Sequence, residues 1–164
     1  MGNKVLDMIK DEDAEYVDIR FTDPRGKLQH VTLIADQVDE DFLEEGFMFD
    51  GSSIEGWKSI EASDMKLMVD LDSAYVDPFY AEKTICVHCS VVEPDTGEAY
   101  ERDPRGTALK AEAYLKSSGI GDVAYMGPEA EFFLFDDVRF QVSMNKVSYQ
   151  VDASDAAWNT DTEY

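Results

Sequence analysis

The chain has 164 residues, of which 14 are Lys or Arg and 36 are Asp or Glu, so its formal net charge at pH 7 is −22. This charge argues against nucleic acid and against an anionic membrane surface as partners, because both are bound through clustered basic side chains. Apolar residues make up 44% of the chain and aromatic residues 12%, which is enough to build a hydrophobic core and argues against disorder.

The sequence shows neither a targeting segment nor a membrane span. Residues 1–10 lack the apolar stretch of a signal peptide, and no apolar run approaches the roughly 20 residues that a spanning helix needs. Two cysteines, Cys86 and Cys89, are too few for a disulfide scaffold, and on a strand they would face opposite sides. We therefore expect a cytoplasmic protein with reduced thiols.

The first hundred residues predict a hairpin, a helix and further strands. In the first strand Val17, Ile19 and Phe21 share one face, while Asp18 and Arg20 share the other. The full set of expected elements is a helix ending near residue 13, strands over 16–22 and 27–34 around a turn at 23–26, a helix over 36–45, and strands over 66–71 and 84–92. This order is the layout of a β-grasp domain, which we expect to span residues 1–102.

A second unit begins at Asp103-Pro104, since aspartate is a good helix N-cap and proline suits the first helical position. We expect it to occupy residues 103–164, with a helix to about 118, a strand over 124–135, and a hairpin of strands over 139–144 and 147–152. One helix and a few strands bury little surface, so this unit looks unfinished.

Two glutamates stand two residues apart in the expected strand 124–135. Side chains alternate along a strand, so Glu129 and Glu131 would share one face at a Cα separation of roughly 6–7 Å. Aromatic residues occur on both faces, so we expect both faces to be covered, and burying two like charges is costly. A divalent cation would offset that cost. A solvated strand edge or the carboxylate pair of an inverting glycosidase would fit the same spacing.

A polar turn follows the apolar residues 47–49. The carboxylate of Asp50 and the hydroxyls of Ser52 and Ser53, beside a glycine that permits a sharp turn, can converge on a small cation. The alternative is a simple Asx-type turn. Trp57 lies in the same polar loop, which suggests either a stacking partner or a residue that anchors the loop to the core.

Together these residues resemble the N-terminal part of a bacterial type I glutamine synthetase. The motifs that carry the resemblance are Arg-Phe-Thr-Asp at 20–23, Phe-Asp-Gly-Ser-Ser at 49–53 with Ser-Asp-Met at 63–65, Arg-Asp-Pro-Arg at 102–105 and Gly-Pro-Glu-Ala-Glu-Phe at 127–132. They follow the family's order and spacing along the whole chain, and Ala130 stands where some members have proline. The resemblance implies an α+β protein, with an N-terminal β-grasp domain followed by the incomplete start of the catalytic α/β domain.

The resemblance also implies an activity, the ATP-dependent ligation of ammonia to the side-chain carboxylate of glutamate through γ-glutamyl phosphate. Two divalent ions, Mg²⁺ or Mn²⁺, would neutralise the phosphoryl charge, with Glu131 as a ligand of one and Glu129 of the other. Asp50 would attract ammonium and help to deprotonate it beside Ser53, and Trp57 would lie at the rim of the active site.

The implied partners are glutamate, ammonium, ATP and further copies of the chain, because in this family the active site forms between subunits, usually in a dodecamer of two hexamers. The family's remaining metal ligands and its ATP contacts would lie beyond Tyr164, so we expect no synthetase activity from these 164 residues alone. Two other interpretations remain open, namely a β-grasp binding or assembly module without catalysis, and a glycosidase that uses Glu129 and Glu131.

Overall fold

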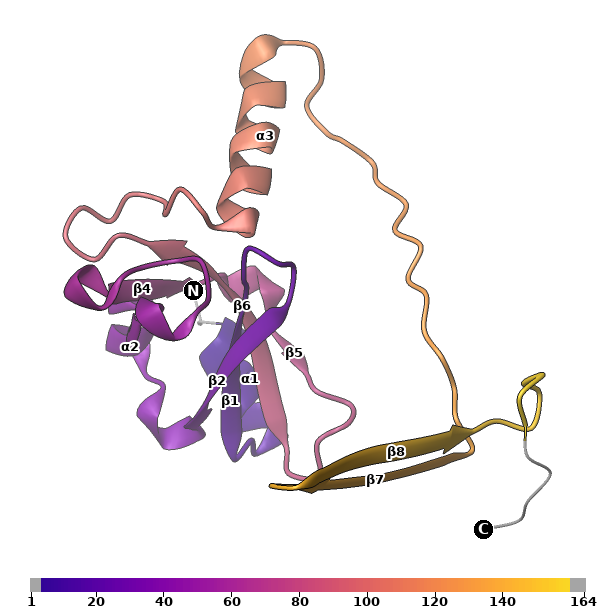
Figure 1. Ribbon diagram of the computed structural model, residues 1–164. Helices are drawn as coiled ribbons and strands as arrows, with labels where there is room; N and C mark the ends of the chain where they lie inside the picture. Colours follow the sequence, from indigo (N-terminus) through magenta and orange to yellow (C-terminus); the bar gives the residue numbers. More distant parts are fainter. Residues whose placement is uncertain (1–3, 160–164) are drawn as a thin grey trace. The chain divides into compact units, whose positions relative to one another are not determined.

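The computed structural model describes residues 4–159, except the side chain of Ala62 (Figure 1). These residues form two compact units, which fall within residues 1–124 and 125–164. None of the helices in the described part of the chain is long and apolar enough to cross a membrane.

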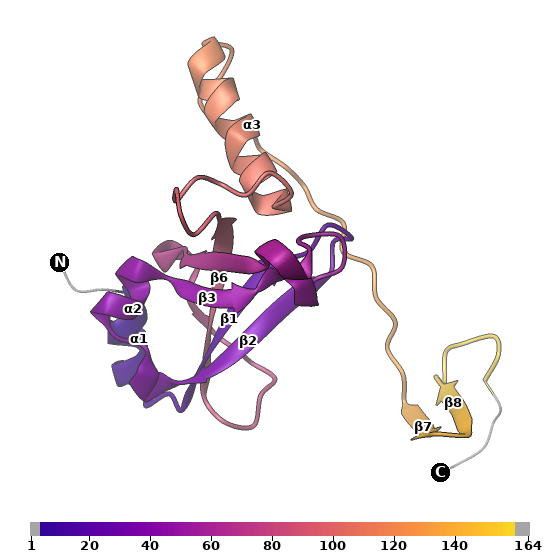
Figure 2. The ribbon, with the colours of Figure 1, turned by 60° about the vertical axis from the view of Figure 1, so that its left-hand side comes forward.

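A six-stranded sheet forms the centre of the first unit, and Figure 2 shows it from a second side. Its strands run in the order β2 (Leu28–Ile34), β1 (Tyr16–Thr22), β6 (Thr84–Val92), β4 (Asp64–Val69) and β3 (Phe47–Asp50), and the short β5 (Tyr75–Val76) pairs with β6. The central strands β1 and β6 are parallel, and every other pair in this sheet is antiparallel. The expected hairpin is therefore β1 and β2, which pair from Tyr16↔Ile34 to Thr22↔Leu28.

The helices of this unit begin and end at residues with clear local signals. Helix α1 (Lys4–Glu12) buries Val5 in the core, and α2 (Glu40–Glu45) starts at Asp39, whose carboxylate accepts from the backbone N–H of Phe42. Helix α3 (Pro104–Ser118) starts at Asp103, as the sequence predicts, and ends at Gly119. The Asp103 carboxylate also accepts from the backbone N–H of Val91 at 3.0 Å, which ties the start of α3 to β6.

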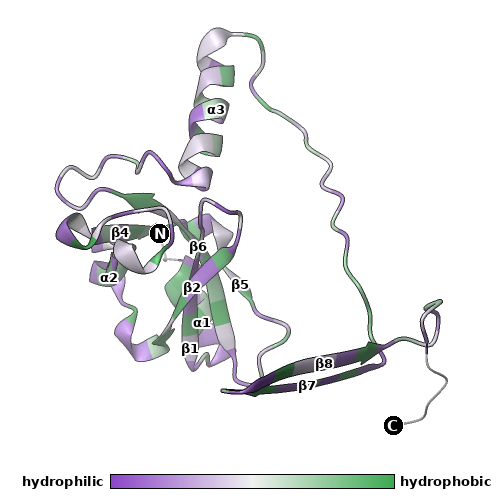
Figure 3. Cartoon of the chain, in the orientation of Figure 1, coloured by the Kyte–Doolittle hydropathy of each residue, from purple (hydrophilic) through white to green (hydrophobic). Residues whose placement is uncertain are grey.

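The hydrophobic core lies on one face of the sheet, and Figure 3 shows apolar residues along its strands. The fully buried side chains of this core include Val17, Ile19, Met65, Leu67, Ile85, Val87, Cys89 and Val91. The alternate residues of β1 and β6 lie on the opposite face, as the period of two predicts. This second face carries the buried carboxylate of Asp18 together with Arg20 and Cys86.

The second unit contains one hairpin. Strands β7 (Asp137–Ser143) and β8 (Lys146–Asp152) pair antiparallel around Met144 and Asn145, one residue earlier than the predicted turn. Most of the apolar side chains along it are more than half exposed, namely Val138, Phe140, Val142, Val147 and Tyr149, whereas Val151 is partly buried.

The predicted strand over 124–135 is wrong. These residues form an extended segment and not a β-strand. Phe132 and Phe133 are 76% and 83% exposed, whereas both faces were expected to be covered. A strand needs a neighbour for its backbone N–H and C=O groups. In the described part of the chain nothing pairs with residues 124–135. The apolar composition of the segment is therefore not enough to make it a strand here.

Candidate functional site

The turn after β3 presents an exposed carboxylate. Asp50 is the last residue of β3, and its Oδ1 accepts hydrogen bonds from the backbone N–H of Ser52 at 2.8 Å and from the Ser52 hydroxyl at 2.6 Å. The Ser52 hydroxyl, followed by the Ser52 N–H, lowers the pKa of the Asp50 carboxyl below its usual range. Asp50 therefore presents a fixed negative charge at the surface, which suits the binding of a small cation.

Gly51 fixes the direction of this turn. Its backbone N–H donates to the Ser63 carbonyl oxygen at 2.7 Å, directly beyond the last β3–β4 pair, Asp50↔Asp64. A Cβ at position 51 would collide with Met65 Cγ and would lie 3.0 Å from the Ser63 oxygen. A larger residue would fit only if the Met65 side chain moved, so the glycine allows the close packing seen here.

The hydroxyl at 2.6 Å from Asp50 Oδ1 belongs to Ser52, and the Ser63 hydroxyl also lowers the Asp50 pKa. Ser53, the hydroxyl that the sequence resemblance favours, lies in the same 3-10 turn, Gly51–Ser53, and is exposed. The role of Ser52 was not predicted individually. The signal that could have identified it is the Asp-x-Ser spacing, because an aspartate commonly accepts from the backbone N–H two residues ahead.

Trp57 is buried, with 5% of its surface exposed. Its ring packs against Phe21, Phe49 and Tyr100 at centroid distances of 5.5, 6.0 and 5.5 Å. It therefore anchors the loop to the core, which was one of the two alternatives open from the sequence. Its indole N–H is buried and lacks a hydrogen-bond partner among the described residues.

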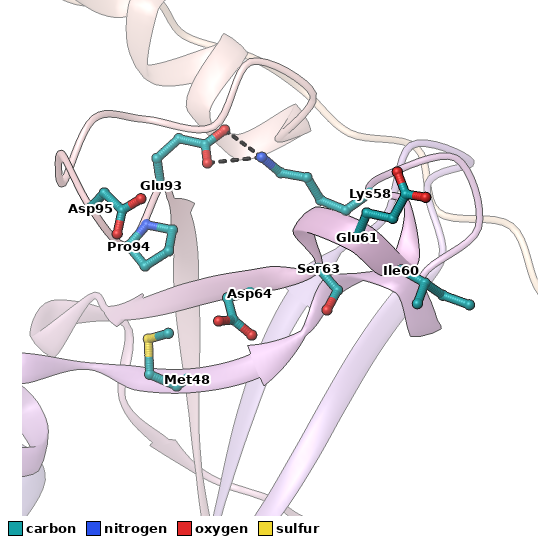
Figure 4. A pocket seen from close by; sticks show the side chains of 9 residues that line it. All are labelled: Met48, Lys58, Ile60, Glu61, Ser63, Asp64, Glu93, Pro94 and Asp95. Atoms are coloured by element: carbon teal, nitrogen blue, oxygen red, sulfur yellow. Dashed lines mark hydrogen bonds and ion pairs between the residues drawn. The ribbon is translucent and has the colours of Figure 1, made fainter.

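A surface cavity of about 410 Å³ lies beside this loop (Figure 4). Its lining is mostly polar and acidic, and consists of Met48, Lys58, Ile60, Glu61, Ser63, Asp64, Glu93, Pro94 and Asp95. Lys58 Nζ donates to both carboxylate oxygens of Glu93 at 2.8 Å, as the dashed lines of Figure 4 show. The remaining carboxylates leave the cavity net negative, so it disfavours anions such as phosphate.

Glu129 and Glu131 belong to the second unit, whereas Asp50, Ser53 and Trp57 share one loop of the first. Both glutamates are exposed on the extended segment that precedes β7. Carboxylate oxygens are suitable ligands for Mg²⁺ or Mn²⁺, but two carboxylates supply only part of a shell of about six ligands. Across residues 4–159 the structure holds no cluster of three or more His, Cys, Asp or Glu side chains arranged for a metal.

The two cysteines are buried and free. Cys89 belongs to the hydrophobic core, whereas the Cys86 thiol lies on the other face and donates to Asp77 at 3.5 Å. Burial raises the pKa of each thiol to about 12. Both thiols therefore stay protonated at neutral pH.

Comparisons with known proteins agree on one family. Residues 13–94 match the model of the glutamine synthetase beta-Grasp domain, and residues 101–164 match that of the glutamine synthetase catalytic domain. The chain is 77% identical over 159 residues to the glutamine synthetase of Cereibacter sphaeroides and 77% identical over 160 residues to that of Rhodobacter capsulatus. These alignments cover 97% and 98% of this chain but only 34% and 36% of the relatives, so the chain spans about a third of their length.

A solved structure is similar in fold. The cryo-EM structure of Plasmodium falciparum glutamine synthetase superimposes with a TM-score of 0.68 at 24% sequence identity, over 92% of this chain and 30% of that one. Together with the match to the beta-Grasp model, this confirms the α+β fold class expected from the sequence.

Proposed function

The chain belongs to the glutamine synthetase family, and we propose that it forms part of an enzyme that ligates ammonia to the side-chain carboxylate of glutamate with ATP. The observation that carries this proposal is the 77% identity to two glutamine synthetases along nearly the whole chain. In the proposed reaction the terminal phosphoryl group of ATP passes to glutamate, giving γ-glutamyl phosphate and ADP. Ammonia then displaces phosphate to give glutamine.

Asp50 is the proposed binding group for ammonium. Its pKa is lowered chiefly by the Ser52 hydroxyl, so the carboxylate is ionised and can hold the cation. Asp50 is also the proposed acceptor of a proton as ammonia forms. Ser53, in the same turn, offers a hydroxyl oxygen as a further acceptor for the N–H groups of ammonium. Trp57 contributes at the rim of the active site by holding this loop against the core.

The two glutamates of the second unit are the proposed metal ligands. Glu131 would hold one divalent ion and Glu129 the other, and the remaining ligands would come from other residues of the enzyme. Bound Mg²⁺ or Mn²⁺ supplies the positive charge that phosphoryl transfer from ATP requires.

We place the domain boundary between residues 102 and 103, where Asp103 caps α3. We also propose that the active site is completed between subunits of a homo-oligomer, a dodecamer.

The test is an assay of the purified full-length protein with ATP, glutamate, ammonium and Mg²⁺. The proposal expects glutamine, ADP and phosphate in equal amounts, and no product when the divalent metal is removed. A full-length protein that is folded and oligomeric but makes no glutamine would contradict the proposal and favour a binding or assembly module.

A further inference from the structure

The loop that follows Asp50 is held at its far end by two side chains from the segment between β6 and α3. The Tyr100 hydroxyl donates to the Trp57 carbonyl oxygen at 3.0 Å. Arg102 Nη1 donates to the preceding carbonyl oxygen, that of Gly56, at 2.7 Å. Two consecutive carbonyl groups of the loop are thus bound by residues that lie 43 and 46 positions later in the chain.

Tyr100 is itself firmly attached to the sheet. It is 5% exposed, its backbone N–H donates to the Val91 carbonyl oxygen at 2.9 Å, and its ring packs edge-on against Trp57. Lys58 is paired with Glu93 (Figure 4). Its Nζ lies 5.1 Å from the centre of the Tyr100 ring. Burial raises the pKa of the Tyr100 hydroxyl, so this group keeps its proton and remains a donor.

A chain of short turns connects this attachment to Asp50. The Trp57 N–H donates to Ile54 O at 3.2 Å, the Ile54 N–H donates to Gly51 O at 3.2 Å, and the Gly51 N–H donates to Ser63 O at 2.7 Å. The turn Gly51–Ser53 therefore lies between two fixed points, and Asp50, the last residue of β3, directly precedes it. Loss of the hydrogen bonds from Tyr100 and Arg102 to the loop would allow the backbone of the turn to shift.

We propose that Tyr100 and Arg102 are positioning residues that hold the turn of Asp50 and Ser53 in the geometry that binds ammonium. The inference rests on the proposed function of Asp50. Both residues act through the carbonyl groups of Gly56 and Trp57, without contact to the substrate. Because a small misplacement of a binding group weakens the interaction it makes, loss of either hydrogen bond should weaken ammonium binding selectively.

The experiment is steady-state kinetics of the full-length enzyme with the variants Tyr100→Phe and Arg102→Met. We expect the KM for ammonium to rise about three- to tenfold in each variant, the effect of one lost hydrogen bond. The KM for ATP, and kcat at saturating ammonium, should stay nearly constant. Arg102→Lys, which keeps a charged donor group, should recover most of the ammonium affinity. An unchanged KM for ammonium in both Tyr100→Phe and Arg102→Met would overturn the inference.

The matched control is Tyr75→Phe. It removes the same atom from another tyrosine of the first unit, in β5, whose hydroxyl accepts from Arg20 Nη1 at 2.7 Å instead of donating to the loop. The KM for ammonium should not change in this variant. An equal rise in Tyr75→Phe and Tyr100→Phe would mean that general loosening of the domain is responsible, and would overturn the inference.

A double variant separates this inference from the proposed function. If Tyr100 acts through Asp50, then Tyr100→Phe should raise the KM for ammonium no further in an Asp50→Asn background. Additive effects would overturn the positioning role while Asp50 keeps its own. If Asp50→Asn alone leaves the KM for ammonium unchanged, the proposed function of Asp50 fails, and this inference fails with it.

Discussion

Asp18 and His30 meet across the β1–β2 hairpin, where Asp18 Oδ1 lies 2.7 Å from His30 Nδ1. The same carboxylate accepts from Thr32 Oγ1 and from Arg20 Nε, each at 2.7 Å, and is completely buried. Burial alone would raise the pKa of Asp18, but the hydrogen bonds from Arg20, His30 and Thr32 outweigh it, and the net shift is downward. A charged residue is thus built into the face of the sheet that lies opposite the hydrophobic core.

Asp18→Ala should destabilise the first unit by about 2–4 kcal/mol, because it leaves Arg20, His30 and Thr32 without a common acceptor. The measurement is urea unfolding of the 164-residue chain, followed by fluorescence of the buried Trp57 in a Trp158→Phe background. Asp95→Asn, at an exposed turn position, is the control and should change the free energy of unfolding by less than about 0.5 kcal/mol. Equal stability of Asp18→Ala and its parent would contradict this assignment.

The same network predicts a loss of stability in acid. The Asp77 pKa is lowered to about 2, first by the backbone N–H of Phe79 and also by Arg20, and the pKa of Asp18 is lowered as well. A carboxyl group whose folded pKa lies below its unfolded value stabilises the fold above the unfolded pKa, and this contribution disappears as the pH falls through the folded pKa. Stability should therefore decline from about pH 4 towards pH 2. In the double variant Asp18→Asn/Asp77→Asn, the free energy of unfolding should fall less steeply as the pH is lowered. An identical slope in the variant and its parent would contradict the prediction.

Gly51→Ala should destabilise the fold by about 1–3 kcal/mol, because its methyl group would collide with Met65 Cγ and would lie only 3.0 Å from the Ser63 carbonyl oxygen. Gly127→Ala is the matched control, since a Cβ there meets nothing within 4 Å. Thermal unfolding of the two variants, measured by circular dichroism, compares them directly. A lower thermal unfolding midpoint for Gly127→Ala than for Gly51→Ala would show that close packing at position 51 does not require glycine.

Most of the first unit could be predicted because its elements carry local signals. Strands β1 and β6 cover the predicted ranges 16–22 and 84–92, since apolar residues alternate along both, and Asp103-Pro104 marks the start of α3. Strands β3 and β5 escaped prediction because four and two residues are too few to show a period. The error at 124–135 has another cause, since a strand depends on a neighbour that its own sequence does not reveal.

The candidate site was predicted only in part. Asp50 and its turn are local features, and a short pattern of aspartate, glycine and serines is enough to indicate them. Tyr100 and Arg102 could not be found in this way, because their contacts with the loop join positions 43 and 46 residues apart. Such contacts follow from the pairing of β4 with β6, which brings the two segments together.

The 164-residue chain alone should form no glutamine from ATP, glutamate and ammonium. Its two proposed metal ligands, Glu129 and Glu131, are exposed on an unpaired segment, and the described residues contain no complete metal-binding cluster. The measurement is glutamine formation by the purified chain at high enzyme concentration with Mg²⁺ or Mn²⁺, with the full-length protein as the positive control. Metal-dependent product from the chain alone would contradict the prediction.

Asp50→Asn in the full-length enzyme should raise the KM for ammonium about 10- to 100-fold, because the variant loses the charge that pairs with the cation. The asparagine oxygen can still accept from the Ser52 N–H and hydroxyl, so the turn should persist and the KM for ATP should change little. Asp39→Asn is the control, since Asp39 is also an exposed aspartate that accepts from a backbone N–H, that of Phe42 at 2.8 Å. Equal losses for ammonium and ATP in Asp50→Asn would mean that this aspartate shapes the turn and does not bind the substrate.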